Sequence, residues 1–351
     1  MNPPPVDVGS LRGFAEALLA AAGARPEAAA AIAEGFLQAD LLGFHSHGLL
    51  RLPQNLDWIR SGATRLVGEP RLLSGRGAVR NADADYLAGA LAMGWICELG
   101  IALAREHGVG VITLRKSQHI GALAPYLLRI AEAGFAAFAM VSTPEESLVT
   151  VEGAREPLFS TNPFGFAFPA DPQPLLLDMS LAVTAAGKLR MAGQEGRRLP
   201  GRWILDARGE PTDDPAAFDG GMLLPLGAPD HAHKGSGLLL WSELFSSCLG
   251  GWGRLDRSGD DDANSVYLAV HDPEAFGGAG QVRREVNHVV SLYEGLAPRG
   301  AGESQRVAGA RALQQRERAL RDGLSLPAPV REALGRAAVQ WGVPAPQALR
   351  G

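Results

Sequence analysis

Lysine is almost absent from this chain. Only three of its 33 basic residues are lysines, Lys116, Lys188 and Lys234, and all the others are arginines. The formal net charge is -5, and the arginines are scattered among 38 acidic residues rather than gathered into a stripe. The sequence therefore offers no basic field for a polyanion, and we expect no nucleic-acid partner.

Cysteine and long apolar runs are also scarce. The two cysteines, Cys97 and Cys248, cannot build a disulfide framework, so we expect a reducing cytoplasm and two small, buried hydrophobic side chains. No uncharged apolar run reaches the roughly 18 residues that a membrane span requires, so we expect no membrane partner. Near the N-terminus, Glu16 interrupts an apolar stretch of helical spacing, which indicates a surface helix rather than a signal peptide.

Two common nucleotide-binding fingerprints are missing as well. No complete GxGxxG follows a predicted strand, and no GxxxxGK[ST] occurs anywhere in the chain. A nucleotide would therefore have to bind through some other arrangement of residues.

The remaining pattern indicates a globular α/β protein of about two domains, by the usual size of roughly 150 residues for each domain. Up to about residue 60 the sequence predicts helices, the first capped by Ser10 and the second opened by Pro26. Short apolar runs predict buried strands at 109–114, 135–142, 163–169 and 174–180, alternating with helices near 87–106 and 121–133. The apolar segment after Lys234 predicts a buried helix, and helices return after residue 300.

The first candidate site is "FHSHGLLRLPQ", residues 44–54. His47 and Arg51 are four positions apart and share a face of any helical turn. An arginine can hold a carboxylate with two hydrogen bonds while a histidine contacts the neighbouring oxygen, which suits an anionic carbonyl compound. The alternative is a helix end with two surface histidines, His45 and His47.

The second candidate is "RKSQHIGALAPY", which leads from a predicted strand into a helix. Sites of α/β proteins collect in such loops, and His119 is placed there to act as an acid or a base, although a single loop histidine is often a bystander. Lys188 and Lys234 both adjoin a glycine, and Gly235 would let a phosphate or ribose approach the start of a helix. An ordinary capped helix is the alternative reading.

A metal site is a further alternative. His45 with His47, and His231 with His233, each put two imidazoles on one side of an extended segment, as metal sites often do. Neither pair is completed by an acidic residue in an HExxH-like motif, so we predict no metal ligand. A metal-dependent hydrolase or lyase remains the alternative function.

Seven segments, in this combination and order, resemble the malate/L-lactate dehydrogenase family of the non-Rossmann type, over about residues 10–345. They are "SHGLLRLP" (46–53), "SQHIGALAPY" (117–126), "STNPFGFAFP" (160–169), "LDMSLAVTAAGK" (177–188), "GRWILDARGEPTDDPAAF" (201–218), "MLLPLG" with "HKGSGLLL" (222–240) and "LAVHDPEAFGG" (268–278).

The resemblance implies a fold and an activity. The fold would be α/β, with a non-Rossmann NAD(P)-binding domain that contains a mixed, largely antiparallel sheet. Residues 1–75 would pack with the helices of residues 300–351 as a helical domain, and residues 76–299 would bind cofactor and substrate. The activity would be NAD(P)H-dependent hydride transfer to or from a 2-oxo acid, a 2-hydroxy acid or a cyclic 2-imino acid, in a cytoplasmic homodimer that uses NADPH or NADH. A non-catalytic, ligand-binding relative is the alternative.

By motif position, His119 is similar to the family's proton donor and acceptor. His47 and Arg51 are similar to its substrate-binding pair, with Arg51 anchoring a small-molecule carboxylate. The implied cofactor-binding residues are Ser142, Asp178, Met179, Ser180, Lys234, Gly235, Gly302 and Glu303.

Four features depart from the family's usual pattern, and one of them is "RGAGE", residues 299–303, in place of a proline-glycine-glutamate sequence. His45 stands where many members carry aspartate, and Ala182 stands where serine is more usual. Residues 228–233 lengthen the segment before Lys234, so we expect His231 and His233 to lie in an inserted loop.

Overall fold

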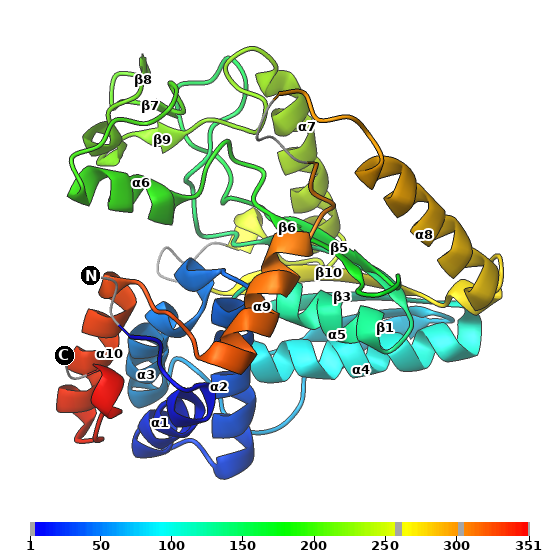
Figure 1. Cartoon of the computed structure of the whole chain (residues 1–351), viewed down its shortest axis with the longest axis horizontal. Coiled ribbons are helices and arrows are strands. Elements are labelled where there is room, and N and C mark those ends of the chain that lie inside the picture. Colours follow the sequence, from blue (N-terminus) through cyan, green and yellow to red (C-terminus); the bar gives the residue numbers. More distant parts are fainter. Residues whose placement is uncertain (1–3, 257–261, 301–304, 350–351) are drawn as a thin grey trace.

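The protein has a mixed α/β fold built on a seven-stranded, mostly antiparallel sheet with the strand order β1-β2-β3-β10-β4-β5-β6 (Figure 1). The computed structural model describes residues 4–256, 262–300 and 305–349. The strands are β1 (Arg71–Arg76), β2 (Val79–Asp83), β3 (Val109–Ser117), β4 (Ala136–Ser142), β5 (Phe164–Phe168), β6 (Leu175–Met179) and β10 (Asn264–His271). Only β2 and β3 pair in parallel. No helix of the described residues is long and apolar enough to cross a membrane.

Strand β10 lies in the middle of this sheet and pairs antiparallel with both β3 and β4. Asn264 lies opposite Ser117, the last residue of β3, and Ser265 lies opposite Ser142, the last residue of β4. Two strands that are both antiparallel to a third run in the same direction. The carboxyl ends of β3 and β4 therefore emerge together, on either side of the start of β10.

Two helices, α4 (Gly89–His107) and α5 (Ala124–Glu132), cover one face of the sheet (Figure 1). Their apolar sides join the sheet in one core cluster that includes the fully buried Ile96 and Ile112. The approach of α4 to β3 requires glycine, because a Cβ at Gly110 would lie 2.5 Å from the backbone oxygen of Gly100. This close packing fixes the distance between α4 and the sheet, and with it the position of β3, the strand that follows α4.

A second apolar cluster joins the two ends of the chain. Its helices are α1 (Val8–Ala21), α2 (Pro26–Leu41), α3 (Leu52–Ser61) and α10 (Ala328–Trp341), while α9 (Ala310–Asp322) contributes Ala319 and also contacts α2. Val6 and Leu324 exchange two backbone hydrogen bonds, of 2.9 and 2.8 Å. Residues far apart in the sequence thus share one core, in which Leu11 and Leu334 are fully buried.

A separate lobe lies on the other side of the sheet from α4 (Figure 1). It contains a small sheet of β7 (Ile204–Leu205), β8 (Pro211–Thr212) and β9 (Met222–Leu223), together with α6 (Ala186–Gln194) and α7 (Ala232–Glu243). A π-helix over Leu244–Cys248 continues α7, and α8 (Ala279–Glu294) follows β10 along the outside of the molecule. Among the described residues the lobe has its own apolar core around Val149, Leu189 and Leu223.

The predicted strands and most helix boundaries are confirmed to within a few residues, including the start of α2 at Pro26. Three predictions were wrong. Asp7, not Ser10, caps α1, because its carboxylate accepts the backbone N–H of Ser10 at 2.7 Å. Cys248 is exposed, since it lies on the outer side of the π-helix, whereas Cys97 is buried as expected. The helix after Lys234 is only partly buried, because Leu240 and Trp241 lie on its solvent side.

The shared core of the chain ends can be tested at Leu334. Leu334→Ala should lower the free energy of unfolding by about 2–5 kcal/mol, because it leaves a cavity where a fully buried side chain packs. Urea denaturation followed by circular dichroism measures this loss. Val339→Ala on the same helix is the matched control, because Val339 is 86% exposed. Equal stability of the two variants would contradict the described packing of α10.

Candidate active site

The turn that carries His47 and Arg51 is held by one buried carboxylate. Asp40, near the end of α2, is fully buried. Its Oδ1 lies 2.7 Å from Nδ1 of His45, and its Oδ2 accepts the backbone N–H of Leu49 at 2.6 Å. Asp40 therefore binds the turn on both sides of His47, at His45 and at Leu49.

Because the Asp40 carboxylate lies so close to the turn, only glycine fits at position 48. A Cβ on Gly48 would lie 2.3 Å from Oδ2 of Asp40, which is closer than real side chains approach. Gly48 separates two short 3-10 turns, His45–His47 and Leu49–Arg51, so the predicted single helical face is replaced by two turns. His47 is the last residue of the first turn and Arg51 is the last residue of the second. The two residues nevertheless lie close together in space.

The loop after β3 brings His119 to the same place. The rings of His47 and His119 are stacked, with centroids 6.0 Å apart and planes inclined by 16°. Gly121, which has a left-handed φ of +78°, lies against the backbone oxygen of His47. Nδ1 of His119 is buried and has no hydrogen-bond partner within the ranges that the structure describes. The two sequence motifs thus form one site.

Arg51 supplies positive charge beside both imidazoles. Its Nε donates to the backbone oxygen of Ser46 at 3.0 Å, and its Nη1 donates to Oε1 of Gln54 at 3.1 Å. These contacts hold the guanidinium against its own turn and direct its charge toward the histidines. A fixed guanidinium of this kind is a suitable anchor for a carboxylate.

The histidines are neutral at physiological pH. Burial, and then the nearby charge of Arg51, lower the pKa of His47 to about 4. Burial, Arg51 and His47 together hold the pKa of His119 well below its ordinary range. Two neutral imidazoles beside a cation form a site that favours an anion and disfavours additional cations.

The predicted cofactor residues on β4 and β6 lie in the same sheet, and several of them already have protein partners. The buried hydroxyl of Ser142 pairs with the hydroxyl of Ser247, and Ser180 makes only a long contact of 3.5 Å to the oxygen of Ala182. Asp178 accepts the backbone N–H of Ala124 at 2.8 Å, at the start of α5. Burial raises the pKa of Asp178 to about 6, although this hydrogen bond opposes the rise.

Lys234 and Gly235 lie in the first turn of α7, in the separate lobe. Lys234 is exposed, while Gly235 is buried, and a Cβ there would lie 2.2 Å from the backbone oxygen of Leu226. Met179 ends β6. Gly302 and Glu303 lie outside the described residues.

The expectation that His231 and His233 lie in a loop was wrong for His233. His231 directly precedes α7, without a side-chain cap hydrogen bond, and His233 belongs to its first turn, because the helix begins at Ala232. Their rings meet edge to face, 6.2 Å apart. In the part of the chain that the structure covers, no three His, Cys, Asp or Glu residues are grouped as metal ligands would be.

Sequence reasoning missed two polar residues at the site. Asp40 could have been noticed as a single charged residue in the apolar run "LQADLLG", where a buried carboxylate needs a partner. Asn264, which contacts the loop of His119, carries no such signal, because an asparagine at the start of a strand is ordinary.

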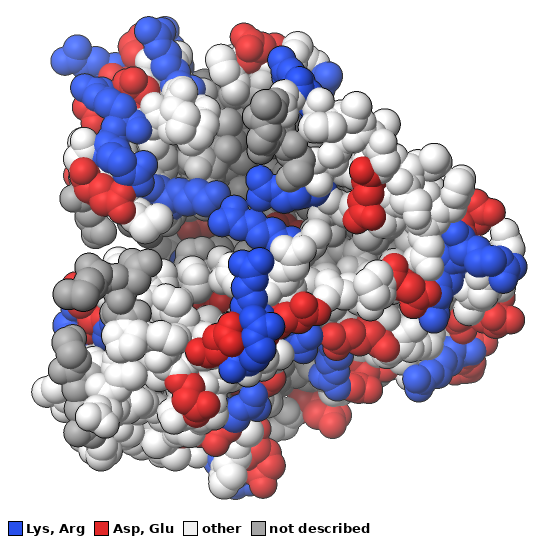
Figure 2. All heavy atoms as spheres, viewed as in Figure 1, with Lys and Arg blue, Asp and Glu red and all other residues white. Residues whose placement is uncertain are grey.

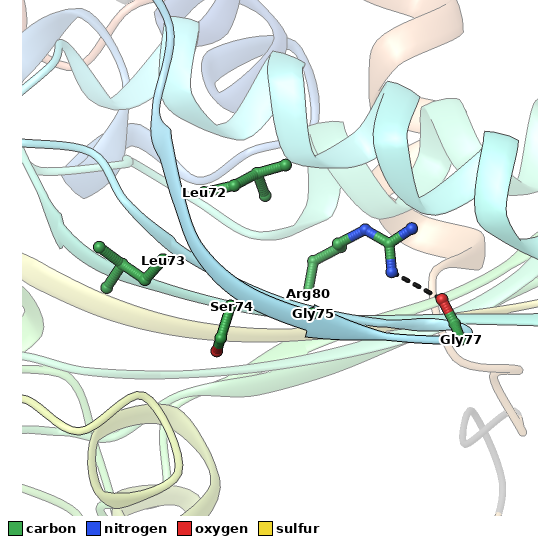
Figure 3. Close-up of a pocket in the computed structure, with 6 residues that line it drawn as sticks. All are labelled: Leu72, Leu73, Ser74, Gly75, Gly77 and Arg80. Atoms are coloured by element: carbon green, nitrogen blue, oxygen red, sulfur yellow. Dashed lines mark hydrogen bonds between the residues drawn. The ribbon is translucent and has the colours of Figure 1, made fainter.

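Basic side chains gather on one face of the molecule. Figure 2 shows them in a row across the hollow between the separate lobe and the helical layer below it. A different hollow, of about 440 Å³, lies at the β1–β2 hairpin and is lined by Leu72, Leu73, Ser74, Gly75, Gly77 and Arg80 (Figure 3). Its lining has one charged side chain, Arg80, whose guanidinium donates to the oxygen of Gly77. None of its lining residues belongs to the loops of His47 and His119.

The neutral state of His47 has a measurable consequence for stability. Between pH 6.5 and about 4 the unfolded chain binds a proton at His47 that the folded protein excludes, so stability falls as the pH falls. His47→Gln should therefore weaken this acid sensitivity by up to about 1.4 kcal/mol per pH unit. Urea denaturation of both proteins at pH 7 and pH 5 measures the difference. Asp40 and Asp178, whose pKa values are raised, titrate in the opposite sense in both proteins. Equal pH dependence of the two proteins would show that His47 is not buried in its neutral form.

Comparison with known proteins places this geometry in a family. The sequence profile described as malate/L-lactate dehydrogenase matches residues 6–335. A Delta(1)-pyrroline-2-carboxylate/Delta(1)-piperideine-2-carboxylate reductase of Pseudomonas syringae pv. tomato is 33% identical over 311 residues, which cover 86% of this chain and 87% of the relative. A malate dehydrogenase of Pyrococcus horikoshii is 29% identical over 338 residues, covering 94% of this chain and 93% of the relative.

Solved structures agree with this placement. A putative malate/lactate dehydrogenase from E. coli superposes with a TM-score of 0.89 at 27% identity, covering 97% of this chain and 96% of the other. The delta1-piperideine-2-carboxylate reductase from P. syringae superposes with a TM-score of 0.83 at 30% identity, covering 95% of this chain and 99% of the other. The chain belongs to the malate/L-lactate dehydrogenase family, and its named relatives are dehydrogenases and reductases.

Proposed function

We propose that this protein is an NAD(P)H-dependent oxidoreductase that interconverts a 2-oxo acid and its 2-hydroxy acid, or reduces a cyclic 2-imino acid. The observation that carries the proposal is the stacked pair His47 and His119 beside Arg51, in a chain of this family. An anion anchor next to a group that can move a proton is the arrangement that a carboxylate-bearing C=O or C=N compound requires. The cofactor is NADPH or NADH.

In this mechanism Arg51 binds the substrate carboxylate, and His47 contacts the adjacent oxygen or nitrogen. Burial, and then the charges of Arg51 and His47, lower the pKa of His119. A bound carboxylate offsets the part of this shift that comes from Arg51, which favours the protonated form of His119 when substrate is present. His119 then donates its proton to the oxygen or nitrogen being reduced. In the reverse direction the neutral imidazole accepts that proton.

The residues near α7 and the sheet ends fit a dinucleotide. Lys234 is exposed in the first turn of α7, a helix with no side-chain cap, where backbone N–H groups and a point charge suit a phosphate. Ser142 ends β4, Asp178 and Met179 end β6, and Ser180 follows directly, all at the same edge of the sheet. These residues would align the nicotinamide. When bound, the reduced cofactor supplies the hydride. The protein supplies alignment and the proton.

The alternative functions have less support. A metal-dependent hydrolase or lyase is not supported by the family assignment, and the paired histidines have other contacts, such as that of His45 with Asp40. A non-catalytic relative would need to have lost a reacting group, whereas His47, Arg51 and His119 are all present and adjacent.

We further propose the finer organisation that the family resemblance implies. The helices of residues 1–75 and 300–351 act as one domain, and residues 76–299 hold a non-Rossmann cofactor site. The shared apolar core of the two chain ends supports this division. A cytoplasmic location is supported by two free cysteines.

The protein is also proposed to be a homodimer. Helix α8 has no buried residue. Three of its large apolar side chains, Val289, Leu292 and Tyr293, are between 46% and 60% exposed. Leu240, Trp241 and Leu244 are similarly exposed on α7 and the π-helix. An apolar strip of this kind is unfavourable in water, and a second copy of the chain is the occupant that the family resemblance suggests.

The catalytic role of His119 is tested by His119→Ala. The variant should bind reduced cofactor, seen as a change in nicotinamide fluorescence, while kcat falls by about 100-fold to 10,000-fold because the proton donor is lost. Both proteins are assayed with a panel of 2-oxo acids and cyclic imines. His107→Ala is the control, since it removes an exposed histidine at the end of α4. If His119→Ala turned over at the wild-type rate, His119 would not be the donor.

The dimer is tested by introducing charge into the strip on α8. Leu292→Glu should shift the protein to monomers at micromolar concentration, because a carboxylate would have to lose its water in the interface. Analytical ultracentrifugation measures the mass. Val339→Glu, which changes an equally apolar but separate exposed position, should leave the dimer intact. A wild-type protein that sediments as a monomer would refute the proposal.

A further inference from the structure

One buried side chain joins the loop of His119 to the end of the neighbouring strand. Asn264 is 4% exposed and begins β10. Its Oδ1 accepts the backbone N–H of Ile120 at 3.0 Å, and its Nδ2 donates to Oγ1 of Thr143 at 2.9 Å. Ile120 follows His119 directly, and Thr143 follows Ser142. The amide thus contacts the neighbours of two predicted site residues.

The pairing of the strands explains why a single side chain can contact both loops. Because β3 and β4 run in the same direction on either side of β10, the loops that leave them are separated only by the first residue of β10. At this position the sheet is irregular, with a register shift between Asn264 and Val266. The side chain of Asn264 contacts both loops at this irregular position.

A series of hydrogen bonds connects Thr143 to α7. The backbone N–H of Thr143 donates to Oγ of Ser160 at 3.1 Å, and Ser160 in turn donates to Asn162. Asn162 donates to Oε2 of Glu243 at 2.9 Å, at the end of α7, the helix that carries the exposed Lys234 in its first turn. All four of these side chains are buried or half-buried, so the loop after β4 is itself held firmly. Asn264 is the link between this held loop and the loop of His119.

We propose that Asn264 is a positioning residue that aligns His119 with the cofactor end of β4. The proposal rests on the proposed oxidoreductase function. Asn264 touches neither substrate nor cofactor; it fixes the backbone on which His119 stands relative to the strand end at Ser142. Without it, the proton donor and the nicotinamide would be held by separate parts of the sheet.

The same sheet contains a matched control pair. Oγ1 of Thr113, in the middle of β3, donates to Oδ1 of Asn81 on β2 at 3.1 Å. Thr113 is 6% exposed and Thr143 is half-buried, and each threonine-to-valine change removes a hydroxyl from a Thr–Asn contact. The control contact lies within the ladder and contacts neither site loop.

The test compares Asn264→Leu, Thr143→Val and Thr113→Val in the full-length protein. Asn264→Leu should lower kcat by about tenfold to a hundredfold, because small misplacements of reacting groups have effects of this size. Its solvent deuterium isotope effect on kcat should increase, since proton transfer from a misplaced His119 becomes rate-limiting. Thr143→Val should have a smaller effect in the same direction, and the double variant should be no slower than Asn264→Leu. Thr113→Val should leave kcat and the isotope effect unchanged.

Hydrogen exchange supplies a readout that does not depend on turnover. The segment 118–123 should exchange faster in Asn264→Leu than in wild type or Thr113→Val, because the Ile120 N–H loses its acceptor. Unchanged exchange there, or a folded Asn264→Leu variant with wild-type kcat and isotope effect, would overturn the proposal. A wild-type protein without turnover on the whole substrate panel would refute the proposed function instead, and the exchange result would still decide the role of Asn264. If Asn264→Leu does not fold, the isosteric Thr143→Val decides by the same measurements.

Discussion

The antiparallel pairing of β10 with both β3 and β4 is the constraint on which the site depends. It places the carboxyl ends of two successive strands at the same edge of the sheet, on either side of a strand that lies far along the chain. The loop of His119 leaves one of them, and the loop after Ser142 leaves the other. The close approach at Gly100 and Gly110 holds α4 against β3 and keeps this edge in a constant position. The sheet, rather than any single loop, thus determines where the predicted site residues lie.

A second constraint is electrostatic. The site combines a buried carboxylate, two neutral imidazoles and a guanidinium, and each of these groups depends on its neighbour. Asp40 is tolerated in the core because His45 and the Leu49 N–H bind it, although burial still raises its pKa. Burial, and then the charge of Arg51, keeps the pKa values of His47 and His119 low. With both imidazoles neutral, the positive charge of Arg51 suits the site to a substrate carboxylate.

Much of this structure could be predicted from the sequence, for identifiable reasons. The strands are short, apolar and bounded by turn residues, and Pro26 and the apolar helix faces mark their elements by local chemistry. His47, Arg51 and His119 could be named as candidates from residue type and motif. Their adjacency could not, because the stacking of two distant loops is a property of the tertiary fold. The cap at Asp7 was missed because Ser10 is an equally good capping residue. Cys248 was misplaced because the π-helix that turns it outward has no sequence signal, and Asn264 was missed because its role arises from strand order alone.

The most direct test of this account is to follow the hydrogen that is transferred. NADH and NADPH labelled with deuterium at both C4 positions of the nicotinamide are incubated with the wild-type protein and a panel of 2-oxo acids and cyclic imines. Mass spectrometry then locates the label in the product. The account predicts deuterium on the carbon next to the carboxylate, with the exchangeable proton on oxygen or nitrogen taken from water through His119. Products without the label, or the absence of any product with both cofactors, would contradict it.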